Sequence, residues 1–305
     1  MVQVTNPWKS RLNYQSLSRI KNWYRFLSPK WQTVHLDYPV DFKPRFLAEL
    51  DRAHGPLEKI LSQRSDVISA EVNQILQFVD DLKAIRKRDE ETNALKPGWN
   101  NGFLPGLDMA ALFSMVATRK PKRYLEVGSG NSTLVAAAAK AQHSPQTEII
   151  SIDPFPRADI DQISQTIIRS PFESVDQSLA LSLEAGDILF IDNSHRVLPN
   201  SDATVVFLEW FPLLKPGVIV QIHDIYIPWD YPQEMCDRAY SEQYMLAMAL
   251  LSNPERYQPL FPAFWVSEHP EFKQTLKSLW NHPNTTGVEP HGGSFWFEVG
   301  TSPIS

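Results

Sequence analysis

The chain has 305 residues, of which 43% are hydrophobic and 21% are charged. This length allows one large domain or a domain with a substantial extra layer, and the apolar fraction argues against wholesale disorder. Twenty-nine basic residues against 35 acidic ones give a net charge of -6, and no block of lysine and arginine stands out. A protein that binds nucleic-acid phosphates normally carries a basic stripe, so that class of partner is disfavoured.

Cysteine usage and the first residues indicate the compartment. Cys236 is the sole cysteine, so neither an intrachain disulfide nor a cysteine zinc cluster can form. The first ten residues lack the pattern of a secretory leader, and no apolar run approaches the roughly 20 residues that span a bilayer. We therefore expect a soluble, cytoplasmic protein without a membrane partner.

The chain is expected to divide near residue 100. Apolar residues recur mostly at three- and four-residue spacings within residues 44–88, which predicts helix. They are Leu57, Ile60, Leu61, Ile68, Val72, Ile75, Val79, Leu82 and Ile85. We expect residues 1–100 to form a mainly helical N-terminal extension or cap, and residues 101–305 to form a second domain. The extension could pack on that domain, serve as a substrate lid or make a dimer contact.

After residue 100 the pattern alternates between strands and helices. Strand-like runs rich in β-branched residues occur at 124–127, 148–152, 166–168, 188–191 and 218–222, with two later ones at 261–266 and 294–299. Helix-like segments occur at 133–142, 175–183, 203–214 and 242–251. Strands separated by helices require crossover connections. The pattern therefore predicts an α/β fold with a mostly parallel seven-stranded sheet, covered by helices on both faces.

The most informative stretch is LEVGSGNST at residues 125–133, where an apolar strand leads into two glycines and then an alanine-rich helix. The glycines allow the backbone to turn sharply and to approach a ligand closely. The helix would direct unpaired N–H groups and its positive dipole end at that ligand. We therefore expect one wall of a ligand site here, formed by Gly128, Ser129, Gly130, Asn131 and Ser132.

Three ligands compete for such a turn. A phosphate-binding P-loop requires a lysine after its last glycine, whereas Asn131 follows Gly130. A dinucleotide site requires a third glycine near Thr133, where there is none. The third ligand is S-adenosylmethionine, whose charged amino-acid part would lie over the turn. Glu126, two residues before Gly128, would repel a pyrophosphate but suits a cationic ligand; a structural turn with a solvated Glu126 is the remaining alternative.

A second acidic residue favours a nucleoside. Asp153 ends the second predicted strand and is followed by Pro154, which stops the strand. An acid at this place in a nucleoside-binding sheet binds the ribose hydroxyls. Ligands of open α/β sheets bind at the carboxyl edge of the strands, so we expect Glu126, Asp153 and the glycine turn to converge there.

These motifs resemble a known superfamily. Residues 125–133 resemble motif I of class I S-adenosylmethionine-dependent methyltransferases, and DILFIDNSH at 187–195 resembles the fourth strand of that superfamily. LLKPGVIV at 213–220 resembles its fifth-strand region, and IHDI at 222–225 is similar to a bacterial small-molecule branch with few assigned substrates. The resemblance covers about residues 103–300. It implies a Rossmann-like fold and S-adenosyl-L-methionine as cofactor, held by the glycine turn with Glu126, Asp153 and Asp192.

Catalytic groups are expected after the fourth and fifth strands. Methyl transfer is an in-line displacement that requires alignment of the acceptor and, where needed, removal of its proton. Asp192, His195, His223 and Asp224 all follow these two strands. An imidazole with a pKa near 6.5 accepts a proton at neutral pH, so the two histidines are natural bases. In the alternative, Asp192 caps its loop and the histidines hold backbone groups.

A divalent metal is possible at the same place but is not favoured. Asp192 and Asp224 match two of the positions at which catechol-type O-methyltransferases bind magnesium. His223 departs from that pattern, because it occupies the place of an adjacent oxygen ligand. Hard cations prefer oxygen ligands, whereas an imidazole favours softer metals.

The sequence thus predicts an S-adenosylmethionine-dependent methyltransferase that O-methylates a small-molecule hydroxyl, for example of a sugar or a natural-product intermediate. Tyr226, Trp229 and Tyr231, which follow the fifth strand, either line the acceptor pocket or pack under a proline-rich loop. Two alternatives remain open at this point. One is an NAD-dependent oxidoreductase, and the other is a non-catalytic module that keeps the fold for S-adenosylmethionine binding or for interaction.

Overall fold

The computed structural model describes residues 23–24, 26–29 and 32–302, and the chain divides into two compact units, residues 1–41 and 42–305. The boundary expected near residue 100 falls inside the second unit. In the first unit, Trp23, Tyr24, Phe26 and Leu27 are helical and exposed. Residues 1–22 of the predicted extension lie outside the described residues.

The second unit is built on a seven-stranded sheet in the order β3-β2-β1-β4-β5-β7-β6. The strands are β1 Arg123–Val127, β2 Glu148–Ile152, β3 Thr166–Ile168, β4 Ile188–Ile191, β5 Ile219–Ile222, β6 Tyr257–Pro262 and β7 Phe295–Val299. The first five are parallel to one another, and β7 runs antiparallel between β5 and β6. The predicted mostly parallel α/β sheet is therefore confirmed.

The register of the central strands aligns their carboxyl ends. Val127 of β1 pairs with Ile152 of β2 and with Ile191 of β4, and Ile191 pairs with Ile222 of β5. Each of these residues is the last of its strand. The residues that follow all four strands therefore lie along one edge of the sheet, where ligands of open α/β sheets bind.

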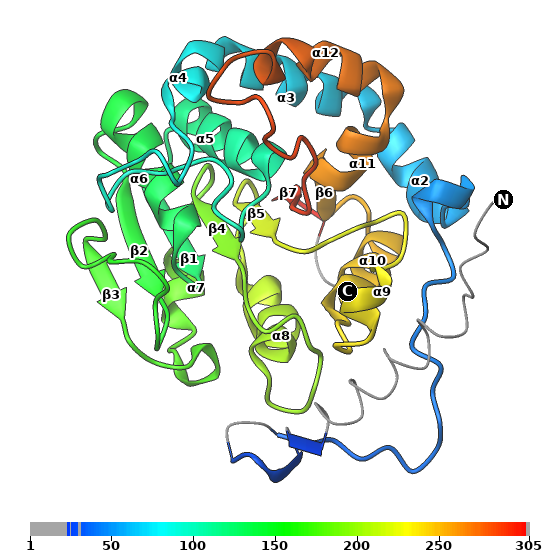
Figure 1. Ribbon diagram of the computed structural model, residues 1–305. Coiled ribbons are helices and arrows are strands. Elements are labelled where there is room, and N and C mark those ends of the chain that lie inside the picture. The colour runs from blue at the N-terminus through cyan, green and yellow to red at the C-terminus, as the bar shows by residue number, and fades with distance from the viewer. Residues whose placement is uncertain (1–22, 25, 30–31, 303–305) are drawn as a thin grey trace, which may run out of the picture. The chain divides into compact units, whose positions relative to one another are not determined.

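Helices cover both faces of the sheet. They are α2 Gly55–Ser62, α3 Ser65–Gln77, α4 Val79–Ala84, α5 Gly106–Arg119, α6 Asn131–His143, α7 Ser178–Ser182, α8 Asp202–Val205, α9 Gln233–Cys236, α10 Glu242–Ser252, α11 Ala263–Glu268 and α12 Pro270–Trp280. Figure 1 shows α3, α5, α6 and α12 on one side of the sheet and α8 and α10 on the other. Helix α5 is buried nearly all round, as its continuous apolar sequence requires.

The predicted apolar stripe of residues 44–88 lies on three successive helices, α2, α3 and α4. Its members Leu61, Ile68, Val72 and Leu82 are almost fully buried and belong to the same hydrophobic cluster as the strands. Helix α3 packs against α5, α12 and β6. The helices of the N-terminal region are thus part of the core that supports the sheet.

Two expected elements differ from those observed. The strand expected at 261–266 ends at Pro262, and Ala263–Glu268 is helix α11. The apolar run there suits a strand or a buried helix equally well, so its periodicity could not distinguish them. The helix expected at 203–214 is broken into α8, a π-helical turn Val206–Trp210 and a 3₁₀ turn Phe211–Leu213, in which Pro212 cannot continue an α-helix.

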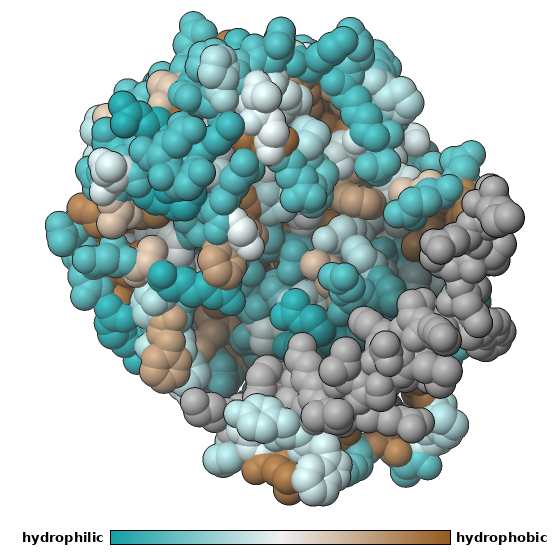
Figure 2. Space-filling model, viewed as in Figure 1, coloured by the Kyte–Doolittle hydropathy of each residue, from teal (hydrophilic) through white to brown (hydrophobic). Residues whose placement is uncertain are grey.

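The face of the molecule seen in Figure 2 is largely polar among the described residues. Figure 2 shows that hydrophilic side chains cover most of the visible face, with hydrophobic ones in small groups. Within residues 23–24, 26–29 and 32–302, no helix combines the length and the apolar character that crossing a bilayer requires.

Candidate active site

The glycine turn connects β1 to α6 and requires glycine at its first position. Gly128 has φ +83°, and a Cβ built on it would lie 1.9 Å from the carbonyl oxygen of Asp192. Any side chain would therefore combine backbone strain with a collision against the end of β4. Gly130 precedes α6, and its N–H donates to Thr133 Oγ1 at 3.0 Å. The turn brings main-chain N–H groups to the carboxyl edge of the sheet.

Glu126 lies beneath this turn, completely buried. One carboxylate oxygen accepts hydrogen bonds from Thr133 Oγ1 and, at 2.7 Å, from Ser151 Oγ; the other accepts from Ser132 Oγ at 3.2 Å. Burial raises the pKa of Glu126 to about 7, against the opposing effect of these hydroxyl donors. Glu126 therefore links β1, β2 and the start of α6, and it does not reach the cavity that the turn borders.

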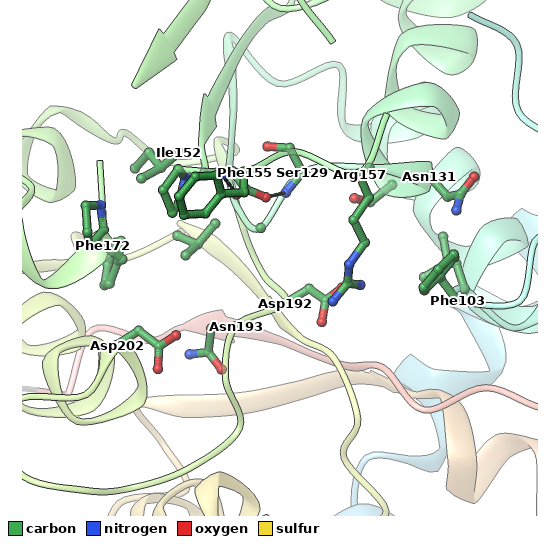
Figure 3. A pocket seen from close by; sticks show the side chains of 18 of the residues that line it. Phe103, Ser129, Asn131, Ile152, Phe155, Arg157, Phe172, Asp192, Asn193 and Asp202 are labelled. Carbon is green, nitrogen blue, oxygen red and sulfur yellow. Dashed lines mark hydrogen bonds between the residues drawn. The ribbon is translucent and has the colours of Figure 1, made fainter. Parts of the chain in front are cut away.

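That cavity has a volume of about 370 Å³ and lies at the carboxyl edge of the sheet (Figure 3). A site of this volume falls in the range of small-molecule pockets. Seven of the eight residues expected to hold a cofactor line it: Gly128, Ser129, Gly130, Asn131, Ser132, Asp153 and Asp192. The exception is Glu126, which lies beneath the turn and does not line the cavity.

Asp153 forms the junction between the turn and the end of β2. Its Oδ2 accepts from the N–H of Ser129 at 2.7 Å, and its Oδ1 accepts from the N–H of Phe155 at 2.7 Å. These bonds fix the carboxylate in the cavity wall and leave further lone pairs available, since each oxygen can accept more than one hydrogen bond. A ribose-binding role for Asp153 remains a prediction.

One buried polar atom in the cavity wall, Asn193 Nδ2, has no hydrogen-bond partner among the described residues. Buried polar groups are nearly always hydrogen-bonded, so an unpaired one in a cavity wall indicates a polar ligand. Apolar side chains, Ile152, Phe155 and Phe172, lie together at the opposite end from Asn131 (Figure 3). The cavity thus suits a ligand with a flat apolar part and a polar part.

The cavity is also lined by residues that were not predicted from the sequence: Phe155, Arg157, Phe172 and Asp202. Phe155 and Arg157 lie in the loop directly after Asp153. Their closeness in the sequence to Asp153 could have identified them, because loops at the carboxyl edge of a sheet carry ligand contacts. Phe172 and Asp202 follow β3 and the β4 loop, where no local pattern identified them.

The predicted catalytic residues come together in a buried cluster beside this cavity. His195 Nε2 lies 3.3 Å from Asp192 Oδ1 and 3.4 Å from Asp224 Oδ2. His223 Nδ1 lies 3.4 Å from Asp224 Oδ1 and 3.8 Å from Asp192 Oδ1. The two aspartates therefore lie between the two imidazoles, and the strand ends bring together all four residues expected from the sequence.

Each histidine also contacts a third carboxylate that was not expected from the sequence. His195 Nδ1 bonds to Glu242 at the start of α10, and His223 Nε2 lies 3.3 Å from Asp108 Oδ2 in α5. Asp108 is also fixed by the N–H groups of Gly293, at 2.7 Å, and Ser294, at 2.9 Å. These partners are far away in sequence, so each imidazole has carboxylates on both of its ring nitrogens.

The environment of the histidines makes them cationic. Burial alone would lower the pKa of His223, but the charge of Asp224 and the contacts with Asp108 and Asp192 outweigh it and raise the pKa to about 9. Burial likewise opposes a charge on His195, yet Glu242 and Asp192 raise its pKa well above the usual value. These raised pKa values favour the imidazolium form of both rings at neutral pH, and a role for either histidine as the base stays a prediction.

The carboxylates of Asp192 and Asp224 are the accessible groups of the cluster. Their side chains are 27% and 18% exposed, whereas both histidines are buried. Burial opposes a charge on Asp192, but the hydrogen bond with His195 and the charge of His223 keep its pKa below the usual value. A ligand that approaches the cluster meets these two carboxyl groups first, with the histidines behind them.

The other expected groups differ in their surroundings. Tyr231 is fully buried, and its hydroxyl accepts from the N–H of Gln243 at 3.0 Å; with Tyr226, Cys236 and Tyr240 it forms a small packed cluster. For a metal, the described ranges contain no group of three or more His, Cys, Asp or Glu side chains arranged to hold an ion. The oxygens of Asp192 and Asp224 instead face imidazoles.

Comparisons with known proteins agree with this site. Residues 125–225 match the model of a family described as a methyltransferase domain. An uncharacterized protein of Archaeoglobus fulgidus is 33% identical over 91 residues, which are 28% of this chain and 41% of that protein. The chain thus spans less than half the length of this curated relative.

Solved structures of methyltransferases are also similar at low sequence identity. The Podospora anserina methyltransferase PaMTH1, bound to SAH, is 17% identical over 65% of this chain and 90% of its own, with a TM-score of 0.38. The plantazolicin methyltransferase BpumL, in complex with SAH and a triazolic desmethylPZN analog, is 13% identical over 80% and 99%, also with a TM-score of 0.38. A 16S rRNA (adenine(1408)-N(1))-methyltransferase from Catenulisporales acidiphilia is 16% identical over 65% and 95%, with a TM-score of 0.32. Similarity at this level carries no information about the methyl acceptor.

Residues 125–225 contain the glycine turn, Asp153 and the loops that carry Asp192 and His223. This segment matches a family described as a methyltransferase domain, and the match bears out the resemblance to methyltransferases drawn from the motifs.

Proposed function

We propose that this chain binds S-adenosyl-L-methionine and transfers its methyl group to a hydroxyl of a small molecule. The observation that carries the proposal is the cavity between the Gly128–Gly130 turn, Asp153 and Asp192, with the ionised cluster beside it. The apolar end near Ile152 and Phe172 suits an adenine ring, and Asp153 lies where a ribose would be held.

The charge of the cavity supports a cationic nucleoside over a dinucleotide. Of the described residues, four acidic ones line it, Asp153, Glu173, Asp192 and Asp202, against one cation, Arg157. A pyrophosphate would bring two negative charges into this surrounding, whereas a sulfonium compound brings a positive one. Electrostatic complementarity therefore disfavours NAD at this site.

The side chains of the cluster support proton transfer from a hydroxyl. When bound, S-adenosylmethionine supplies a methyl carbon whose bond to sulfur breaks as the bond to the acceptor oxygen forms, leaving S-adenosylhomocysteine, a methyl ether and one proton. The carboxylate of Asp224 or Asp192 accepts that proton, because both side chains are partly exposed beside the cavity. His195 and His223, as imidazolium groups, hold these carboxylates in place and balance their charge.

The acceptor class follows from access and charge. Since Asp192 and Asp224 expose only small fractions of their side chains, a protruding hydroxyl reaches them more readily than a group on a large flat surface. The net charge of -6 and the absence of a basic run in the sequence favour an uncharged small molecule over nucleic acid.

The test begins with calorimetric titration of the full chain with S-adenosylmethionine and with NAD. We expect saturable binding of S-adenosylmethionine and none of NAD; the absence of S-adenosylmethionine binding would overturn the proposal. Methyl transfer is then measured with labelled cofactor across a panel of hydroxylated sugars and natural products. Tight cofactor binding without transfer to any hydroxyl would favour a non-catalytic binding module.

A further inference from the structure

Among the residues that the structure describes, Arg157 is the single basic side chain in the wall of the cavity, beside four acidic ones. An acidic wall accounts for the attraction of a cationic nucleoside. It does not account for the carboxylate of an amino-acid ligand, which the four acids would repel. The position of the one cation therefore matters for how such a ligand is oriented.

Arg157 lies at the glycine-turn end of the cavity. Its main-chain N–H donates to the carbonyl oxygen of Ser129 at 3.2 Å, which ties the loop after β2 to the turn. Its guanidinium carbon lies 5.1 Å from the centre of the Phe103 ring, in a cation–π contact. Figure 3 shows the side chain extending across the cavity toward Asp192, between Ser129 and Phe103 and away from Phe172.

We propose that Arg157 binds the carboxylate of the amino-acid part of S-adenosylmethionine, with Phe103 stacked on the guanidinium as the cover of that end. The inference rests on the proposed function and adds to it the residue that recognises the amino-acid part. A guanidinium offers two parallel N–H donors to a carboxylate, and its planar face remains free to stack on an aromatic ring. In the free protein Arg157 instead faces Asp192, whose charge it partly balances.

The chemistry of the ligand supports this orientation. With the adenine between Ile152 and Phe172 and the ribose at Asp153, the amino-acid part extends past the turn toward Arg157. The ligand carries one carboxylate, one ammonium and one sulfonium group. Arg157 complements the single anion, and Asp192 and the other acids complement the two cations.

The experiment compares three ligands by calorimetry with the full chain and with Arg157→Met. They are S-adenosylmethionine, its decarboxylated form, which lacks only the carboxylate, and 5′-methylthioadenosine, which lacks the whole amino-acid part. We expect Arg157→Met to weaken S-adenosylmethionine binding about tenfold to a hundredfold, the range for a hydrogen-bonded charge pair. Binding of the two ligands without a carboxylate should change less than about twofold, and Arg157→Lys should be intermediate because lysine cannot bind bidentately.

Arg169→Met is the matched control, because Arg169 follows β3 and pairs with Asp161 outside the cavity. It should bind all three ligands like the unaltered chain, and circular dichroism should show both variants folded. The inference is overturned if Arg157→Met weakens all three ligands equally or tightens S-adenosylmethionine binding, which would mean that Arg157 only shapes the loop or only neutralises Asp192. If the unaltered chain binds none of the three, the proposed function itself fails.

Discussion

Two buried histidines carry raised pKa values at this site. His223 has a pKa of about 9 because its carboxylate neighbours outweigh the effect of burial, and the pKa of His195 is also raised. A histidine that is protonated at neutral pH cannot remove a proton from an acceptor. Under the proposed function, each histidine instead positions a carboxylate, and Asp192 or Asp224 is the base.

This assignment predicts the shape of the pH profile. As pH rises through about 9, His223 loses its proton, and the carboxylates of Asp224 and Asp108 lose their counter-charge. We expect kcat with a hydroxyl acceptor to stay level between pH 7 and 8 and to fall as pH rises through about 9. A kcat that instead rises through pH 6.5 and stays high at pH 10 would show that a neutral histidine is the base.

Replacement of Asp224 tests the proton acceptor directly. Asp224→Asn keeps the size of the side chain but removes its charge and its basicity. We expect kcat to fall by about 10²–10⁴-fold, the usual contribution of a general base. Calorimetric affinity for S-adenosylmethionine should stay within about threefold, because Asp224 does not line the cofactor cavity. An unchanged kcat in this variant would assign proton transfer to Asp192 alone.

Glu126 makes stability depend on pH in a defined direction. Its folded-state pKa of about 7 lies above the usual 4.5 because the carboxyl group is buried. A raised acid pKa means that the folded state holds the proton more tightly, so this contribution to stability is full below pH 4.5 and is lost as pH rises through 7. We expect the free energy of unfolding of Glu126→Gln, measured relative to that of the unaltered chain, to rise by roughly 3 kcal/mol as pH goes from 4.5 to 8.

Urea unfolding of both proteins at pH 5 and pH 8 measures this difference, and groups that titrate equally in both proteins cancel. Glu271→Gln, at an exposed position of α12, is the control for loss of a carboxylate. A difference between Glu126→Gln and the unaltered chain that does not vary with pH would mean that Glu126 is ionised throughout in the folded state.

At the scale of elements, the β1–α6 turn is the most constrained connection of the site. Gly128 has a positive φ, and a Cβ there would collide with the carbonyl oxygen of Asp192, which directly follows β4. We expect Gly128→Ala to lower the free energy of unfolding by about 3 kcal/mol or more and to abolish S-adenosylmethionine binding, because the turn or β4 must shift.

Gly186→Ala separates the effect of backbone strain from the effect of the collision with Asp192. Gly186 also has a positive φ of +86°, but a Cβ there meets nothing within 4 Å. This variant should lose only about 1 kcal/mol in urea unfolding and keep its cofactor affinity. Equal losses in the two variants would show that backbone strain, and not the contact with Asp192, makes glycine necessary at position 128.

The elements that support the site could be predicted because their signals are local. The runs ending at Val127, Ile152, Ile191 and Ile222 are short, apolar and β-branched, and parallel pairing then aligns their ends by geometry alone. The run 261–266 was mistaken for a strand because its apolar residues carry no period. A buried helix such as α11 and a buried strand look alike at that length.

The site was predictable only in part, because local sequence patterns do not reveal contacts between residues that are distant in the sequence. Asp192, His195, His223 and Asp224 each follow a strand, so topology alone brings them together. Their environment depends on partners that are distant in the sequence. Glu242 contacts His195 from 47 residues away. Asp108 contacts His223 and is itself held by Ser294, 186 residues away. No local pattern marks such pairs, so the raised pKa values of the histidines could not be foreseen. Burial of Glu126 beneath the turn was hidden likewise, since it depends on Ser151 of the neighbouring strand.

For the molecule as a whole, the decisive feature is how the N-terminal helices join the core. Leu61 of α2, Val72 of α3 and Leu82 of α4 belong to the same buried cluster as the strands. Glu71 of α3 is almost fully buried and pairs with Arg119 at the end of α5. Removal of these helices would expose α5, which is apolar on nearly all sides, and would leave a charged group without its partner.

Two truncations test this organisation. A chain of residues 42–305 retains the whole second unit, and we expect it to unfold in a single cooperative transition and to bind S-adenosylmethionine.

A chain of residues 101–305 retains every strand but lacks α2, α3 and α4. We expect it to aggregate or to form a loosely packed state. Each large apolar side chain buried by these helices contributes about 1.5–3 kcal/mol, so the total lost with them exceeds the 5–15 kcal/mol free energy of unfolding that is usual for a domain. Calorimetric unfolding and near-ultraviolet circular dichroism distinguish the outcomes. A cooperative melt of residues 101–305 would show that the methyltransferase domain folds without the helices, and that their packing serves the acceptor side of the site instead.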